Sequence, residues 1–412
     1  MSSPVEQVTE LDPGSRRDAA RLSRYLVMAL LARTADEGAR VALVIFALDR
    51  TGSAAVGGML VATLLLPHVV AAPLVGGLVD RSRRPAAVLA AAIAVFASAL
   101  AATVALLGHA PLWQTYLVLA IAGCCGPAVT GGLTSQLAAL AGSAHARAFA
   151  LDSLSYTVAG MVGPATVGLA VAYASPSAAI MALAVAGGLG ALGVASLRLP
   201  ALSAGKQTRA VDLFQGAREF VRNRALRTIT LATSVGQLGL GGLAVVATTL
   251  AAAAHQPSRA GLLLSVTAGG AFVGSLLWAW RPMPASRAPL VTVWAMVAVG
   301  VPLALAATVH SLSLAAALFA LSGLFTGPFA AALFLARSQL AAETTRTQVF
   351  TIGAGLKVAA SAIGIGLLGL ATDLPAGAQL LVVAAFPILA GVAGGVLLRR
   401  PRAVAGEHID AC

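Results

Sequence analysis

The chain has 412 residues, of which 58% are hydrophobic and 10% are charged, and its formal net charge is +12. An ordinary soluble domain carries roughly 25% charged residues, and the mean hydropathy here is +0.89. These values exclude a soluble domain and indicate a polytopic membrane protein. Ten-residue segments of alternating hydropathy are absent from the sequence, which argues against an outer-membrane barrel.

Apolar segments that are long enough to cross a bilayer recur along the whole chain. A helix needs about 20 apolar residues to span the hydrocarbon core. We predict twelve such helices, over 25–48, 55–79, 85–107, 112–138, 148–173, 176–197, 227–253, 260–280, 286–309, 312–336, 347–371 and 375–398. The predicted fold class is therefore an all-α membrane protein with twelve transmembrane helices.

The longest polar segment between these helices divides the chain near its centre. The expected parts are an N-terminal tail (1–24), a six-helix bundle (25–199), a linker (200–226), a second six-helix bundle (227–398) and a C-terminal tail (399–412). Within the linker, Asp212 is placed to cap a short amphipathic helix. We interpret that helix as a surface connection between the two bundles.

The positive charges predict the orientation of the chain in the membrane. Lysines and arginines concentrate in the two tails and in the loops that follow even-numbered helices. The exceptions are Arg50 and Arg259 on the opposite side, and Arg33, Arg40 and Lys357 within helices. This asymmetry follows the positive-inside rule, so both termini are expected on the cytoplasmic side of a bacterial inner membrane. The basic net charge reports topology and does not indicate nucleic acid.

A short repeat relates the two predicted bundles. The sequence SQLAA occurs at 135–139 and again at 338–342, and each copy follows a Gly-Pro pair, at 126–127 and 327–328. Both copies fall at the same end of the fourth helix of a bundle. We therefore infer a duplication, with two parallel six-helix repeats.

The loop after the second predicted helix reads GGLVDRSRRP and resembles the loop signature of the major facilitator superfamily. The matching residues are Gly76, Asp80, Arg81 and Arg84, whereas the glycine usual three residues after the acid is an arginine here. Two six-helix repeats joined by a central cytoplasmic loop are the architecture of that superfamily. The resemblance implies twelve helices that rock about a central substrate site.

The resemblance also implies a role for Asp80 in gating. In the family this acid is thought to bind the start of the eleventh helix and to favour the outward-facing state. The alternative is that Asp80 pairs only with Arg81 or Arg84 in water. We favour the gating interpretation.

The fifth predicted helix contains GMVGPATVG, which resembles the Gly-Pro motif of exporters in the superfamily. Its residues are Gly160, Gly163, Pro164 and Gly168. Helix packing is the direct role that we expect of the small residues. The motif favours a twelve-helix exporter similar to bacterial drug-proton antiporters and siderophore exporters. The fourth helix lacks the arginine that many such antiporters carry there, which leaves their proton-relay scheme in question.

Four charges lie within the first predicted helix. Arg33, Asp36, Glu37 and Arg40 are spaced so that they share one helix face and pair with one another. Four such charges facing lipid would cost roughly 10 kcal/mol or more, so this face must look into protein or water. We expect a polar cavity wall that takes part in proton coupling. A permanently closed ion-pair network is the alternative.

Other polar residues within helices are weaker candidates. Lys357 is expected to pair with Asp36 or Glu37 across the cavity. His68 is expected to be a hydrogen-bonded packing residue more than a coupling residue, and Gln136 and Gln237 either bind substrate or bridge helices. Asp152 is interpreted as an acid at a helix start.

These features predict a secondary active transporter that exports small amphipathic molecules, either drugs or secreted metabolites, in exchange for protons. The sequence contains no nucleotide-binding motif, so an ion gradient is the expected energy source and no cofactor or metal is expected. The family expectation is a monomer. An uptake symporter or facilitator is the alternative. A membrane enzyme or receptor is disfavoured, because no nucleophile-base pair, metal cluster or signalling module is present.

Overall fold

The computed structural model describes residues 13–141, 144–197, 199, 215–256, 259–281, 284–369, 371 and 373–399. These residues form helices joined by short turns. The predicted cap Asp212, most of the linker and the C-terminal tail beyond Arg399 lie outside the described residues.

The helices follow the predicted spans closely. Those of the first half are α1 (Pro13–Thr51), α2 (Ala54–Arg81), α3 (Pro85–Leu106), α4 (Leu112–Pro127), α5 (Leu133–Leu140), α6 (His145–Tyr173) and α7 (Pro176–Ala195). Those of the second half are α8 (Gln215–Arg222), α9 (Arg224–Gly241), α10 (Leu243–Ala253), α11 (Ala260–Trp280), α12 (Ala288–Ala306), α13 (Leu312–Leu340), α14 (Arg346–Gly369) and α15 (Ala376–Arg399).

Two predicted spans contain a local change of helix geometry. In the fourth, Pro127 removes a backbone donor, and a π-helical turn (Ala128–Gly132) connects α4 to α5. In the seventh, Gly242 separates α9 from α10. The first span also differs from the prediction, because α1 begins at Pro13 instead of residue 25.

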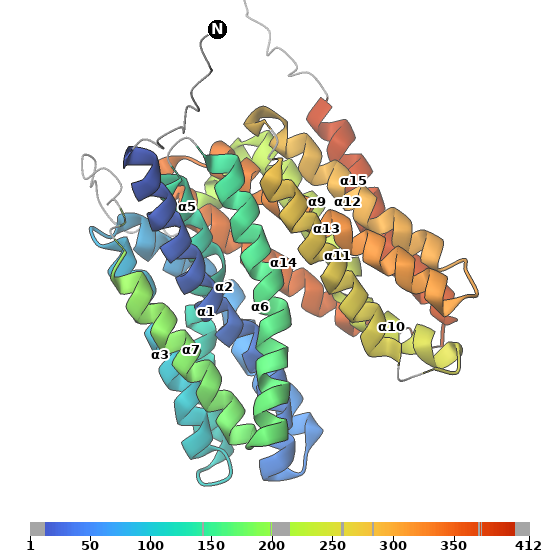
Figure 1. Cartoon of the computed structure of the whole chain (residues 1–412), viewed down its shortest axis with the longest axis horizontal. Helices are drawn as coiled ribbons and strands as arrows, with labels where there is room; N and C mark the ends of the chain where they lie inside the picture. Colours follow the sequence, from blue (N-terminus) through green and yellow to red (C-terminus); the bar gives the residue numbers. More distant parts are fainter. Residues whose placement is uncertain are drawn as a thin grey trace, which may run out of the picture.

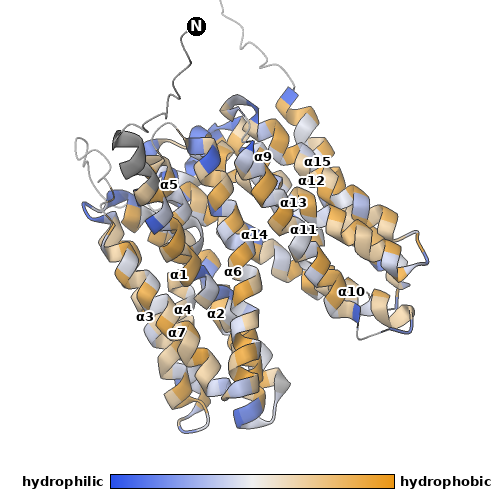
Figure 2. Ribbon diagram, in the orientation of Figure 1, coloured by the Kyte–Doolittle hydropathy of each residue, from blue (hydrophilic) through white to orange (hydrophobic). Residues whose placement is uncertain are grey.

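The described part of the chain contains eleven helical segments that are long and apolar enough to cross a membrane. Their outer faces expose large apolar side chains, including Leu66, Val70 and Leu192. Figure 2 shows hydrophobic residues along the lengths of the helices and hydrophilic residues gathered towards their ends. The protein is therefore a multi-pass membrane protein.

The helices pack in two groups. In the first half α1 contacts α2, α6 and α7, and α3 contacts α4 and α7. In the second half α13 contacts α11 and α12, and α15 contacts α9 and α12. The main contacts between the halves join α2 to α14, and α6 to α11 and α13. Figure 1 shows the groups close together where α1 begins and α15 ends, and further apart towards the opposite end.

A buried apolar core fills the junction between the halves at the end where they approach. It includes Val79 and Phe149 from the first half and Phe329 and Phe350 from the second. The rings of Phe149 and Phe350 stack with their centroids 6.2 Å apart. Apolar packing therefore closes this end of the molecule, which we call the closed end.

Candidate functional site

The four charges of α1 divide into two separate groups. Arg33 is 1% exposed and forms an ion pair with Asp152 of α6, with 2.8 Å between Nη1 and Oδ1. The expectation that Arg33 pairs within its own helix is therefore wrong. A partner on the neighbouring helix allows both charges to be buried together, which removes the cost of exposing either one to lipid.

Further polar groups complete the surroundings of this ion pair. Thr134 lies between the two charges: its Oγ1 accepts a hydrogen bond from Arg33 Nη2 at 3.0 Å and lies 2.9 Å from Asp152 Oδ2. The Tyr25 hydroxyl donates to Asp152 Oδ1 at 3.0 Å, and the Arg33 guanidinium lies 3.7 Å from the centre of the Tyr156 ring. This network ties α1 to α5 and α6.

The position of Asp152 also corrects the sequence interpretation. The helix α6 begins at His145, so Asp152 lies about two turns inside it and is completely buried. It is the partner of a buried arginine and not an acid at a helix start.

The second group on α1 consists of two carboxylates that share one guanidinium. Arg40 Nη2 lies 2.8 Å from Asp36 Oδ2, and Arg40 Nη1 lies 3.1 Å from Glu37 Oε2. The Asp36 side chain is 7% exposed, whereas those of Glu37 and Arg40 are about a third exposed. If both acids are ionised, this triad carries one negative charge. Protonation of one acid makes it neutral and leaves an ion pair in place.

His68 on α2 is a packing residue. It is 4% exposed, and its Nε2 lies 3.3 Å from Thr130 Oγ1 in the π-helical turn. A Cβ added at Gly126 would lie 2.6 Å from the ring, so the imidazole fits tightly against α4. This agrees with the expectation of a hydrogen-bonded histidine.

At the closed end, Asp80 connects the two halves. Its Oδ1 accepts a hydrogen bond from the Thr347 amide and its Oδ2 accepts one from the Gln348 amide, each at 2.9 Å. These amides belong to the first turn of α14, where helix N–H groups lack partners within the helix and the helix dipole favours an anion. The contact implied by the family resemblance is therefore present.

The arginines of the loop signature do not compete for Asp80. Arg81 and Arg84 are exposed, and neither forms an ion pair with Asp80 within the described part of the chain. The alternative, in which Asp80 pairs only with these arginines, is therefore wrong.

Small residues bring α2 and α14 into direct contact beside Asp80. A Cβ at Gly76 would lie 2.5 Å from Thr351 Oγ1 and 2.6 Å from Gln348 Cα. The Thr351 hydroxyl donates to the Ala72 carbonyl at 2.7 Å. Gln136 adds a contact from α5, because its Nε2 lies 3.2 Å from Thr347 Oγ1. Gln136 thus bridges the two halves.

Gln348 was not identified from the sequence, although it joins three elements. Its amide donates to Asp80, and its Oε1 accepts a hydrogen bond from the Gly216 amide of α8 at 2.6 Å. Glu219 of α8 also accepts a hydrogen bond from the Ala342 amide at 3.3 Å. The helix α8 therefore packs directly on the closed end.

Lys357 does not have the partner that was expected. Its Nζ lies 5.3 Å from the centre of the Phe329 ring, and it forms no ion pair with any acid that the structure describes. The pairing with Asp36 or Glu37 is therefore wrong, because those acids are engaged by Arg40 on α1. Arg337 of α13 lies nearby, because its guanidinium lies against Gly353, one turn before Lys357 on α14.

Arg337 is a second buried cation that the sequence analysis placed in a loop. It lies near the end of α13 and is 1% exposed. Arg337 directly precedes the second SQLAA copy, just as Thr134 directly precedes the first, and Thr134 contacts Arg33 in the first half. This correspondence could have indicated that Arg337 is buried within a helix. Hydropathy alone instead ended the predicted helix at residue 336.

The Gly-Pro motif of α6 packs through one of its glycines. A Cβ at Gly163 would lie 2.7 Å from the Gly38 nitrogen and 3.0 Å from the Thr34 carbonyl oxygen of α1. Gly160 and Gly168 have no atom within 4 Å of such a Cβ. Pro164 is half-buried on the same helix. The expected packing role therefore falls on Gly163.

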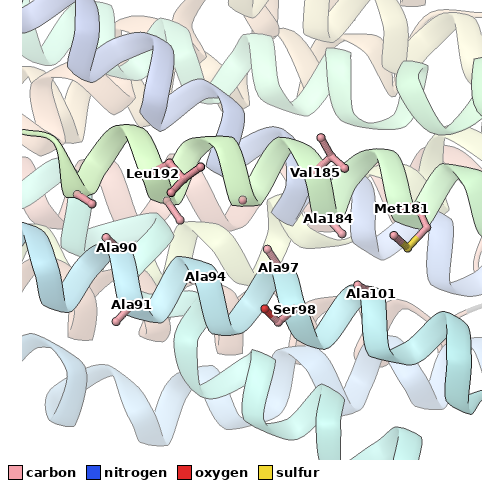
Figure 3. A pocket seen from close by; sticks show the side chains of 13 residues that line it. Ala90, Ala91, Ala94, Ala97, Ser98, Ala101, Met181, Ala184, Val185 and Leu192 are labelled. Atoms are coloured by element: carbon pink, nitrogen blue, oxygen red, sulfur yellow. The ribbon is translucent and has the colours of Figure 1, made fainter.

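Two other features lie apart from these clusters. Gln237 is half-buried on α9 and makes no side-chain hydrogen bond with the residues that the structure describes. Figure 3 shows a groove between α3 and α7, which is lined by small apolar side chains such as Ala94 and Ala97. None of the predicted site residues lines this groove, so it is not the candidate site.

Comparisons with known proteins agree with this arrangement. The family model described as Major Facilitator Superfamily matches residues 25–252. An uncharacterised transporter of that type from Sinorhizobium fredii is 30% identical over 264 residues, which are 63% of this chain and 62% of that relative. The multidrug efflux pump Tap of Mycobacterium bovis is 29% identical over 406 residues, which cover 93% of this chain and 95% of the pump.

Solved structures share the fold at low sequence identity. A bacterial homologue of the iron transporter ferroportin in an outward-facing state has a TM-score of 0.74 at 16% identity, over 92% of this chain and 100% of that chain. The human organic anion transporter MFSD10 has a TM-score of 0.72 at 16% identity, over 94% and 100%. The Escherichia coli fucose:proton symporter has a TM-score of 0.70 at 13% identity, over 93% of this chain and 98% of that chain.

Proposed function

Because this chain belongs to the Major Facilitator Superfamily, we propose that it is a proton-coupled exporter of small amphipathic molecules that works by alternating access. The similarity to a multidrug efflux pump over nearly the whole chain supports export. A membrane potential or proton gradient supplies the energy, and no cofactor takes part.

The triad of Asp36, Glu37 and Arg40 is the observation that carries the proposal of proton coupling. A simple ion pair is neutral, whereas two ionised carboxylates within 3.1 Å of one guanidinium leave one negative charge in excess. The triad is neutral when one acid is protonated and negative when neither is, so it responds to proton binding without losing its arginine partner. Its partial exposure gives protons and substrate a route to the charges.

The two halves move about the closed end in this account. Contact between Asp80 and α14, together with the apolar core at that end, holds one state. We assign this end to the cytoplasm by the positive-inside rule, which makes the state outward-facing. In this topology α1 is the twelfth transmembrane helix, since it is long enough to span and its charges are paired, Arg33 with α6 and Arg40 with two acids of α1. The protein then works as a monomer in the bacterial inner membrane.

Transport in intact cells tests the proposal. Efflux-deficient bacteria that express the wild-type chain are compared with cells that express equal amounts of Asp36→Asn, using cationic, neutral and anionic fluorescent compounds. Export predicts lower accumulation of at least one compound in wild-type cells and restored accumulation in the variant. Asp49→Asn is a matched control, because Asp49 is half exposed at the end of α1. Higher accumulation in wild-type cells would contradict export and favour uptake.

A further inference from the structure

Arg337 and Lys357 form a pair of cations that has no acidic partner in the described part of the chain. Arg337 is 1% exposed, and neither its Nε nor its Nη2 has a hydrogen-bond partner among the residues that the structure describes. Lys357 is half-buried on α14, four residues after Gly353, against which the Arg337 guanidinium lies. No acid of the described ranges forms an ion pair with either cation. Both cations must therefore be held without a counter-charge from these residues.

The two arginines within α1 are compensated by acids. Arg33 is neutralised by Asp152, and Arg40 is shared by Asp36 and Glu37. Burying an uncompensated charge is costly, and unpaired charges within a membrane protein normally face a water-filled or ligand-filled space. Within the described ranges, the cation pair of α13 and α14 thus lacks the compensation that the arginines of α1 have.

Local packing places the Arg337 guanidinium at a defined position. It lies against the backbone of α14 at Gly353, where an added Cβ would be 2.5 Å from Cζ and 2.6 Å from Nη2. Gly353 precedes Lys357 by one helical turn, so the guanidinium carried by α13 lies against α14 about one turn from the Lys357 position. Ten residues of α14 separate Lys357 from Thr347, which places the ammonium roughly 15 Å from the Asp80 contact along the helix.

One aromatic ring lies beside the cation pair, and other aromatic rings lie at the junction of the two halves. The Phe329 ring lies beside the Lys357 ammonium at 5.3 Å. The Phe334 ring contacts Tyr156 of the other half, with 5.5 Å between the ring centres, and Phe350 at 6.3 Å. A molecule bound at Lys357 would therefore meet positive charge and the Phe329 ring, beside α14, which crosses the middle of the molecule in Figure 1.

We propose that Arg337 and Lys357 bind the anionic group of the transported molecule, which is an organic anion with a carboxylate on an aromatic or apolar body. The free guanidinium donors supply directed hydrogen bonds to the carboxylate, and Lys357 adds a second positive charge. This inference names the substrate class of the proposed exporter and rests on that proposed function. It does not depend on proton coupling.

A binding measurement without any gradient tests the inference. Purified full-length protein in detergent is titrated with 1-naphthoate, and the apparent Kd is read from the rise in the unfolding temperature. The comparator is 1-naphthamide, which has the same ring system without the charge. We expect naphthoate to stabilise the wild-type protein and naphthamide to leave its unfolding temperature unchanged.

Substitutions then locate the site. We expect Arg337→Gln and Lys357→Met each to raise the Kd at least about tenfold, because each removes a charged partner of the carboxylate. Gly353→Ala keeps both charges but displaces the guanidinium, so it should also weaken binding. Arg259→Gln removes an exposed positive charge at the start of α11 and should leave the Kd unchanged. Since Lys357 is half-buried, its variant tests the site even if Arg337→Gln fails to fold.

Three results would overturn the inference: equal stabilisation by naphthoate and naphthamide, an unchanged Kd in the folded variants, or an anionic lipid as the occupant. The last is tested in nanodiscs of phosphatidylglycerol and of phosphatidylcholine. Stabilisation by phosphatidylglycerol that requires Lys357, without any effect of naphthoate, would identify a lipid site. If naphthoate binding requires Lys357 but flux ignores the proton gradient, the proposed coupling fails and the anion site stands.

Discussion

Arg33 and Asp152 meet inside the first half with 2.8 Å between guanidinium and carboxylate, and both side chains are almost completely buried. The pair joins α1 to α6. With Arg33 engaged in this way, the triad of Asp36, Glu37 and Arg40 is the part of the α1 charge cluster to which we assign proton coupling. The same helix thus contains a structural ion pair and a candidate coupling group.

The buried pair predicts strong coupling between two substitutions. Asp152→Asn leaves the Arg33 charge without its partner, and Arg33→Gln does the same to Asp152, so each single variant should lose about 3–5 kcal/mol of stability. The double variant should lose less than the sum of the two. Thermal unfolding in detergent measures this double-mutant cycle. Additive losses would contradict a direct ion pair.

Asp36→Asn is the matched control for that cycle. It removes a carboxylate from a partly exposed triad in which Glu37 still pairs with Arg40 at 3.1 Å. We expect a smaller loss of stability than in Asp152→Asn, because partly exposed ion pairs contribute about 0–1 kcal/mol. An equal loss would mean that both charge groups are structural.

Asp80→Asn is predicted to shift the balance between states. The variant retains an oxygen for one amide of α14 but loses the anion that the helix start favours, at a cost of about 1–2 kcal/mol. The ratio of open to closed molecules at this end should therefore rise roughly fivefold to thirtyfold. Spin labels at Arg83 and Thr344, which are both exposed, measure that ratio as a distance distribution.

The control for this shift is Arg81→Gln, which changes an exposed neighbour of Asp80 that makes no ion pair with it among the described residues. Its distance distribution should match that of the unmodified chain. A shift in Arg81→Gln as large as that in Asp80→Asn would point to loop charge in general and contradict a specific contact between Asp80 and α14.

The Gly-Pro motif predicts different effects for its glycines. Gly163→Ala places a Cβ 2.7 Å from the backbone of α1, so the two helices must separate, which should cost about 1–3 kcal/mol. Gly160→Ala and Gly168→Ala meet no atom within 4 Å and should be neutral or slightly stabilising in a helix. Unfolding temperatures of the three variants provide the comparison. A similar decrease in all three would refute the assignment of packing to Gly163.

The outline of the fold was predictable because two general constraints determine it. The length of an apolar segment decides whether it can span the bilayer, and the charges of the loops decide its orientation. Span boundaries follow from hydropathy, and Asp80 was assigned to the start of α14 because its loop resembles a known signature. Each prediction depends on a short segment of sequence and does not require knowing which helices are neighbours.

The partners of the buried charges were not predictable in the same way. Within α1 the spacing alone gives Arg33 an acid at the next turn, yet the neighbouring helix supplies Asp152. Arg337 was missed because a charged residue near a helix end resembles a loop residue in hydropathy. In each case the deciding information is which helices are adjacent, and a single sequence does not contain it.

Transport by the purified protein tests the central claim most directly. Inside-out proteoliposomes are given an inside-acid pH gradient, and accumulation of the compound identified in cells is measured for the wild-type chain and for Asp36→Asn and Glu37→Gln. We predict accumulation by wild type that collapses with the pH gradient. In the variants we predict loss of accumulation, with exchange of labelled for unlabelled compound retained. Accumulation that is indifferent to both pH gradient and membrane potential would contradict proton coupling through the triad on α1.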